Sequence, residues 1–106
     1  MTTFDKREEG FEKRFALDEE TRFKALARRN KKLGLWAAEK LGLTDEAAQA
    51  YAKEVVIADL EEAGDEDVFR KLRADFDAKG VVVSDHQIRR SMDEFLAVAA
   101  SEVKGG

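Results

Sequence analysis

The sequence predicts an all-α protein, folded as a compact four-helix bundle, and three observations support this class. The 106-residue chain contains no proline, while the strong helix formers Ala, Leu, Glu, Lys and Arg are abundant. Glycine stop signals, each followed by a helix start signal, divide the chain into four segments. The connections between these segments are short, which favours antiparallel neighbours. A chain of this length has room for one domain.

The first helix is expected at about residues 19–41. Gly34 lies inside it and should cost about 1 kcal/mol relative to Ala, for which the usual structural reason is close approach of another helix. The segment 21–41 carries a net charge of +6, from seven bases and Glu39. Its apolar positions are Phe23, Leu26, Leu33, Trp36, Ala37 and Leu41.

The second and third helices are expected at about 45–62 and 66–79. Glycines at 42, 64 and 80 suit the left-handed position just past a helix end. Segment 42–64 carries a net charge of −5, so we expect it to lie beside the basic first helix. The second helix has apolar residues Ala48, Tyr51, Ala52, Val55 and Ala58, with Val56, Ile57 and Leu60 widening the stripe; the third has Val68, Phe69, Leu72 and Phe76.

The fourth helix, at about 85–103, has the clearest signals. Ser84 and Gln87 have the spacing of a capping box, in which each side chain bonds the other's backbone N–H. Val81–Val83 has no other strand to pair with, so it is expected to be an extended linker pinned to the core. The apolar stripe of this helix is Ile88, Met92, Phe95, Leu96, Ala99 and Val103.

The composition leaves little material for catalysis or metal binding. The absence of Cys excludes disulfides and thiolate chemistry, and His86 is the only histidine. Ser84, Asp85 and His86 are adjacent on one helical turn, which is not the geometry of a catalytic triad. The apolar runs are too short for a transmembrane helix or a signal peptide. We therefore expect an intracellular, soluble protein that is not an enzyme and holds no metal or cofactor.

Residues 1–18 differ from the rest of the chain. Phe4, Phe11 and Phe15 recur at intervals of seven and four, on one helical face, within an otherwise charged segment. Gly10 interrupts this face, and so short a helix is marginal alone in water. Two interpretations remain open from composition: the segment packs on the bundle as a further helix, or it is an arm that becomes helical on a partner.

Nucleic-acid binding is a further alternative. Arg28–Arg29 and Lys31–Lys32 form a basic stripe, and phosphate contacts need only such a stripe. The overall charge of −4 and the lack of a second basic patch argue against it. No nucleic-acid partner is therefore expected.

Five blocks of sequence stand out along the chain: Phe4–Glu12, Ala27–Glu39, Tyr51–Val56, Asp67–Lys71 and Asp85–Arg90. Together they resemble the zeta-type inhibitor subunits of alphaproteobacterial F-type ATP synthases. The blocks occur in order over nearly the whole length, which makes the resemblance specific.

The resemblance implies a bundle at 19–106 that anchors a mobile inhibitory arm at 1–18, inserted as a helix into the catalytic head to block ATP hydrolysis. The partners would be the alpha, beta and gamma subunits, with the protein monomeric when free and cytoplasmic, peripheral to the inner membrane. The arm residues expected to bind are Phe4, Asp5, Lys6, Arg7, Glu8, Phe11, Glu12, Arg14 and Phe15. An alternative is weak binding of ATP or ADP by Arg28, Arg29, Lys32 and Trp36.

Overall fold

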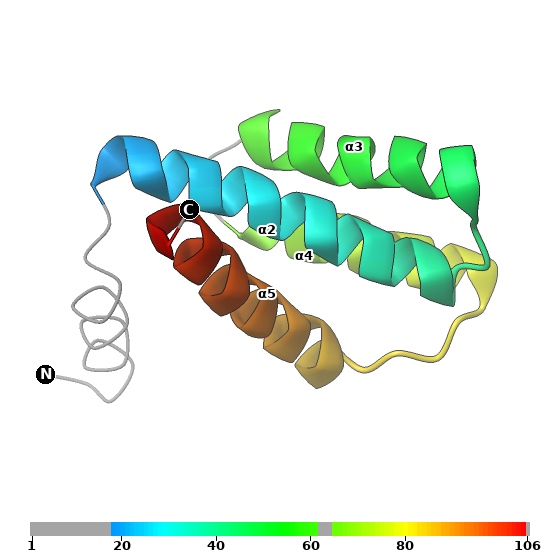
Figure 1. Cartoon of the computed structure of the whole chain (residues 1–106). Helices are drawn as coiled ribbons and strands as arrows, with labels where there is room; N and C mark the ends of the chain where they lie inside the picture. The colour runs from blue at the N-terminus through cyan, green and yellow to red at the C-terminus, as the bar shows by residue number, and fades with distance from the viewer. Residues whose placement is uncertain (1–17, 62–64, 106) are drawn as a thin grey trace, which may run out of the picture.

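The computed structural model describes residues 18–61 and 65–105, and four helices make up most of this part of the chain (Figure 1). They are α2 (Glu19–Lys40), α3 (Asp45–Glu61), α4 (Glu66–Lys79) and α5 (Asp85–Gly105). Each begins at the expected residue and ends within two residues of the expected end. The all-α, four-helix class is confirmed. The predicted arm, residues 1–18, lies outside the described residues except for Asp18, and the predicted stop at Gly64 also lies outside them.

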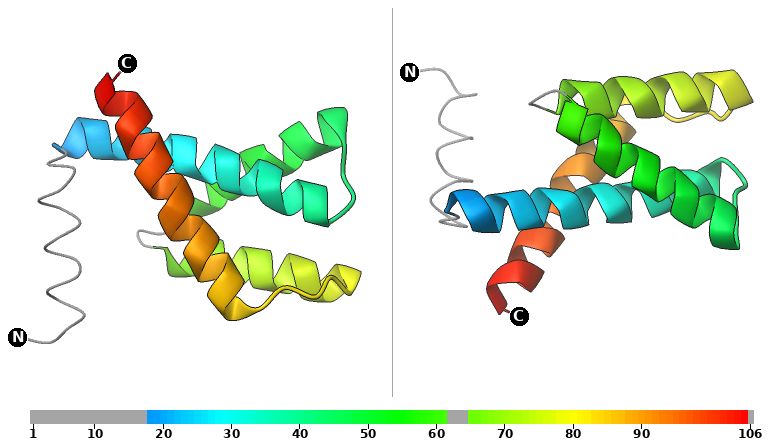
Figure 2. Two further views of the ribbon diagram at one scale, coloured as in Figure 1. Left: turned by 60° about the horizontal axis from the view of Figure 1, so that its bottom comes forward. Right: turned by 90° about the horizontal axis from the view of Figure 1, so that it is seen from above.

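The four helices contact one another in a ring. α2 packs against α3 on one side and α5 on the other, while α4 contacts both α3 and α5. α2 and α3 run antiparallel side by side, whereas α5 crosses α2 steeply (Figures 1 and 2). The basic and acidic segments are thus neighbours, as expected. The helices are therefore not all aligned along one axis, because α5 crosses α2 at a steep angle.

Glycine ends two of the helices in the predicted way. Gly42 and Gly80 have φ values of 80° and 70°, in the left-handed region that glycine adopts without strain. Beyond α4, the Val81 N–H donates to the Phe76 carbonyl at 2.8 Å, the six-to-one bond of a Schellman motif. These turns reverse the chain within a few residues and so keep consecutive helices adjacent.

The linker into α5 also follows the prediction. Val83 is buried, and its carbonyl accepts a 2.6 Å hydrogen bond from Arg73, which pins the extended segment to α4. The capping box is complete, since Ser84 N–H donates to the Gln87 side chain and Gln87 N–H donates to Ser84 Oγ, at 2.9 and 3.1 Å. The contact of the linker with α4 and the capping box together fix the residue at which α5 begins.

The core lies where the four helices face each other. Trp36 sits at its edge, with its ring edge-on to Phe76 and Phe95 at centroid distances of 5.9 and 6.5 Å. The hydrophobic side chains that form this core are Leu33, Ala37, Ala38, Leu41, Tyr51, Val55, Val68, Leu72, Phe76, Val83, Ile88 and Met92.

Among the described residues of the predicted apolar stripes, two are exposed to solvent. Phe23 is 60% exposed and Ile57 is 44% exposed. The end of α3 meets α2 near Arg29, where Asp59 approaches the guanidinium. Phe23 is nearly two turns earlier on α2 and therefore lies beyond the cover that α3 provides. Periodicity identified the right face of the helix but not how far along the helix the neighbour extends.

Candidate functional site

The point where residues 1–17 join the bundle is defined by Asp18. Its carboxylate accepts a 2.7 Å hydrogen bond from the Thr21 N–H and so caps α2. This bond holds the pKa of Asp18 below its usual value. Glu19 and Glu20 in the first turn suit the positive end of the helix dipole. The predicted arm residues from Phe4 to Phe15 all lie outside the described residues.

Arg29 is the buried member of a polar cluster between α2, α3 and the start of α4. Its side chain is 1% exposed; Nε donates to Asn30 Oδ1 at 2.8 Å and Nη2 donates to Asp65 Oδ1 at 2.9 Å. Asp59 Oδ1 lies 3.9 Å from the same Nη2. Because Asp65 gives its carboxylate to Arg29, it makes no side-chain cap on α4. The cluster ties α2, α3 and the start of α4 together.

Arg28 and Lys32 face α5 instead. Both reach Glu102, at 3.4 and 3.0 Å respectively. The hydrogen bond from Lys32 is the main cause of the lowered pKa of Glu102. Together with the buried Arg29 and the half-buried Trp36, these are the residues predicted for nucleotide binding. The structure does not bring the four onto one open surface.

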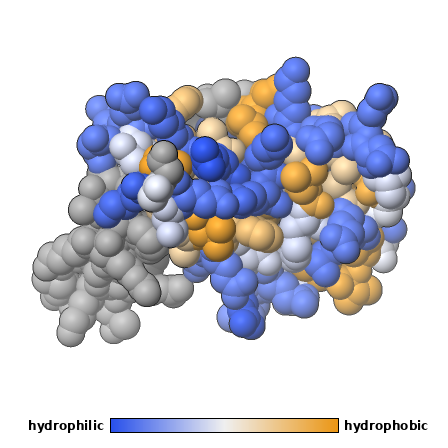
Figure 3. All heavy atoms as spheres, viewed as in Figure 1, coloured by the Kyte–Doolittle hydropathy of each residue, from blue (hydrophilic) through white to orange (hydrophobic). Residues whose placement is uncertain are grey.

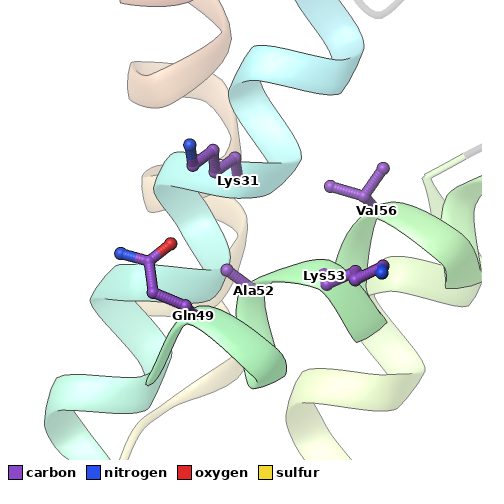
Figure 4. Close-up of a pocket in the computed structure, with 5 residues that line it drawn as sticks. All are labelled: Lys31, Gln49, Ala52, Lys53 and Val56. Atoms are coloured by element: carbon purple, nitrogen blue, oxygen red, sulfur yellow. The ribbon is translucent and has the colours of Figure 1, made fainter. Parts of the chain in front are cut away.

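A shallow groove of about 380 Å³ lies on the outer side of the contact between α2 and α3. α2 contributes Lys31, and α3 contributes the other lining residues, Gln49, Ala52, Lys53 and Val56 (Figure 4). Both lysines and Gln49 are exposed, and the two lysines form no ion pair within the part of the chain that the structure describes. Polar ends thus surround an apolar floor.

Gly34 sets how closely α2 and α3 approach at Ala52, which is one of the lining residues of the groove. A Cβ atom there would lie 2.5 Å from the Ala52 Cα atom, so only glycine allows α2 and α3 to approach this closely. This confirms the close helix approach predicted at Gly34. Sequence reasoning placed Lys31 in a basic stripe and did not connect it with Lys53. The available signal was that Lys53 is the one base in segment 42–64.

A second polar cluster joins α3 to α4. The Tyr51 hydroxyl donates to Asp75 Oδ2 at 2.7 Å, and Lys71 Nζ lies 3.0 Å from the same oxygen and 3.1 Å from Glu54. Burial and the bond to Asp75 raise the pKa of Tyr51. For Lys71, burial alone would lower the pKa, but the hydrogen bonds to Asp75 and Glu54 outweigh it and raise the pKa. This cluster is internally satisfied and serves packing.

Neither a metal centre nor a membrane span is found among residues 18–61 and 65–105. No three His, Cys, Asp or Glu side chains there come together in a way that could hold a metal ion. None of the four described helices is long and apolar enough to cross a bilayer. In the face shown in Figure 3, apolar side chains reach the surface in separate patches among hydrophilic ones.

Fold and surface therefore define an all-α, four-helix domain whose α2–α3 side carries a groove with an apolar floor and a polar rim. The family model for ATPase inhibitor subunit zeta matches residues 1–102, and the chain belongs to that family. It is also similar to a protein solved by solution NMR, with 48% sequence identity and a TM-score of 0.69, over 78% of this chain and 94% of the other. Comparison with curated proteins gives no match.

Proposed function

We propose that this protein inhibits ATP hydrolysis by the catalytic head of an F-type ATP synthase. Residues 1–18 insert as a helix among the alpha, beta and gamma subunits, and the bundle holds the arm at that site. The protein would act at the cytoplasmic face of the inner membrane through the synthase. The observation that carries the proposal is the family match, which spans both the arm and the bundle.

The mechanism follows from the residues of the arm. A rotary motor stops when a helix fills a cleft that must change shape in every cycle. Phe4, Phe11 and Phe15 supply apolar anchors on one face of such a helix, and the charged residues between them pair with the walls of the cleft. Asp18 fixes the first turn of α2, so the arm joins the bundle at a defined point.

The affinity of such an arm is moderated by its folding. A segment that becomes ordered only on binding gives up roughly 2–5 kcal/mol of its interaction energy. That cost would keep the affinity moderate and the inhibition reversible.

The test is ATP hydrolysis by the purified catalytic head, measured with the full chain and with a variant that lacks residues 1–15. We expect inhibition by the full chain alone, because the deletion removes the proposed anchors Phe4, Phe11 and Phe15. The described helices begin at Glu19, outside the deleted segment. Circular dichroism of the variant checks that the bundle is intact. Equal inhibition by a folded variant would remove the arm from the mechanism.

A point substitution sharpens this test. Phe11→Ala should raise the inhibitory concentration about tenfold, equivalent to about 1.4 kcal/mol, since truncated aromatic anchors commonly cost this much or more. Its thermal melting should equal that of the parent chain. An unchanged inhibitory concentration would exclude Phe11 as an anchor.

A further inference from the structure

We propose that the groove between α2 and α3 is a docking surface for an acidic, amphipathic helix of a protein partner. Its floor is Ala52 and Val56, and its polar rim is Lys31, Gln49 and Lys53. The inference rests on the proposed function in one respect, because it takes the catalytic head of the synthase as the partner. The groove would then be the surface by which the bundle holds on while the arm inhibits.

The cations of α2 around Lys31 have partners within the domain. Lys24 pairs with Glu20, Arg28 and Lys32 with Glu102, Arg29 with Asp65, and Lys40 lies over the Trp36 ring. Lys31 has no such partner among the described residues. It faces the groove, where its charge is available to another molecule (Figure 4).

α3 contributes a second cation, Lys53, to the groove. Six acids and the single base Lys53 lie in segment 42–64, yet Lys53 is on the side that faces Lys31 and the groove. The polar ends of Gln49 and Lys53 extend to opposite sides of Ala52 in Figure 4. The groove is therefore locally positive, although the net charge of the protein is −4. Charge complementarity selects a carboxylate-bearing partner.

Exposed apolar side chains lie beyond the groove, along the same faces of α2 and α3. Gln49, Lys53 and Ile57 are spaced four apart and form one ridge along α3, and Ile57 is 44% exposed. On α2 the corresponding ridge runs from Lys31 through Ala27 to Phe23, which is 60% exposed. Each ridge carries a lysine beside the groove and an exposed apolar side chain at its far end. An amphipathic helix with acidic and apolar positions matches this pattern, whereas a small free anion would use only the lysines.

The position of the groove fits an anchoring role. Lys31 is 13 residues after Asp18, which is about 20 Å along a helix. A partner helix seated in the groove would thus lie within reach of the point where the arm begins. Docking there would hold the arm close to its cleft and raise its effective concentration.

Two readouts on the full chain test the proposal. The first compares inhibition by the double variant Lys31→Glu and Lys53→Glu with that by the control Lys79→Glu and Lys104→Glu, which changes net charge equally at exposed lysines outside the groove. We expect the groove variant to need about tenfold more protein for half-inhibition and the control to match the parent chain. The difference should shrink as salt is raised, and full inhibition should return at excess. Melting of all variants should be alike.

The second readout uses the absence of Cys from the chain. A photo-crosslinker attached at Gln49→Cys should join the chain to a subunit of the purified catalytic head, while the same group at Ser101→Cys on α5 should not. Both positions are exposed.

The outcomes separate the groove from the inhibitory function. Unchanged half-inhibition by the groove variant without crosslinking from position 49 would overturn the groove and leave the inhibitor intact. Crosslinking from position 49 by a parent chain that does not inhibit would support the groove and overturn the inhibitory function. A crosslinked dimer of the chain itself would assign the groove to a second copy and overturn the proposal.

Discussion

Arg29 and Lys31 are two residues apart on α2, and they show two uses of the same charge. The Arg29 guanidinium is buried and donates hydrogen bonds to Asn30 and Asp65, whereas the Lys31 ammonium is exposed and has no ion pair among the described residues. In the sequence both belong to one basic run. The difference teaches that the packing of neighbouring helices, and not residue type, separates a cation that stabilises the fold from one that can bind a partner.

The strongest way to break this comparison is Arg29→Ala. We expect a loss of about 3 kcal/mol in the free energy of unfolding, because the change leaves a void and removes the donor to the buried Asn30. The melting temperature should fall by roughly 12 °C or more. Lys31→Ala is the matched control and should stay within about 0.5 kcal/mol of the parent chain. Similar melting of the two variants would refute the distinction.

Gly34→Ala tests the helix contact that creates the groove. A more helix-prone residue would by itself add about 1 kcal/mol, but the new Cβ atom would lie 2.5 Å from the Ala52 backbone. We expect a net loss of about 1–2 kcal/mol in chemical denaturation, since overpacking forces the backbones apart. Gly105→Ala, where nothing lies within 4 Å, is the control. Stabilisation by Gly34→Ala would contradict the close approach.

Removing the hydrogen bond from Tyr51 to Asp75 should have a smaller effect on the free energy of unfolding than Arg29→Ala or Gly34→Ala. Tyr51→Phe should cost about 1 kcal/mol, the usual worth of one hydrogen bond. Because burial raises the pKa of Tyr51 in the folded state, its contribution is complete below the unfolded pKa of about 10 and is lost as the pH rises further. Tyr51 is the only tyrosine, so phenolate absorbance reports it alone. In the folded chain phenolate should appear only above the pH at which it appears in urea. Coincident titrations would disprove the buried bond.

Much of the fold could be predicted because its signals are local. The left-handed glycines at 42 and 80 and the capping box at Ser84 depend on a few consecutive residues, and the structure has each of them. Gly34 predicted a close helix contact because an interior glycine needs a reason of that kind. The candidate site was harder to predict from the sequence, because Lys31 and Lys53 lie on different helices and come together only when α2 packs against α3.

The helices, their order and the family could be predicted from the sequence, because periodicity, caps and the blocks that resemble the family each depend on consecutive residues. Only the tertiary structure decided that Arg29 is buried, that Arg28 and Lys32 turn to Glu102, and that Phe23 and Ile57 stay exposed. The physical reason is that burial depends on where a neighbouring helix ends and at what angle it crosses. Those quantities are set by the packing of all four helices together.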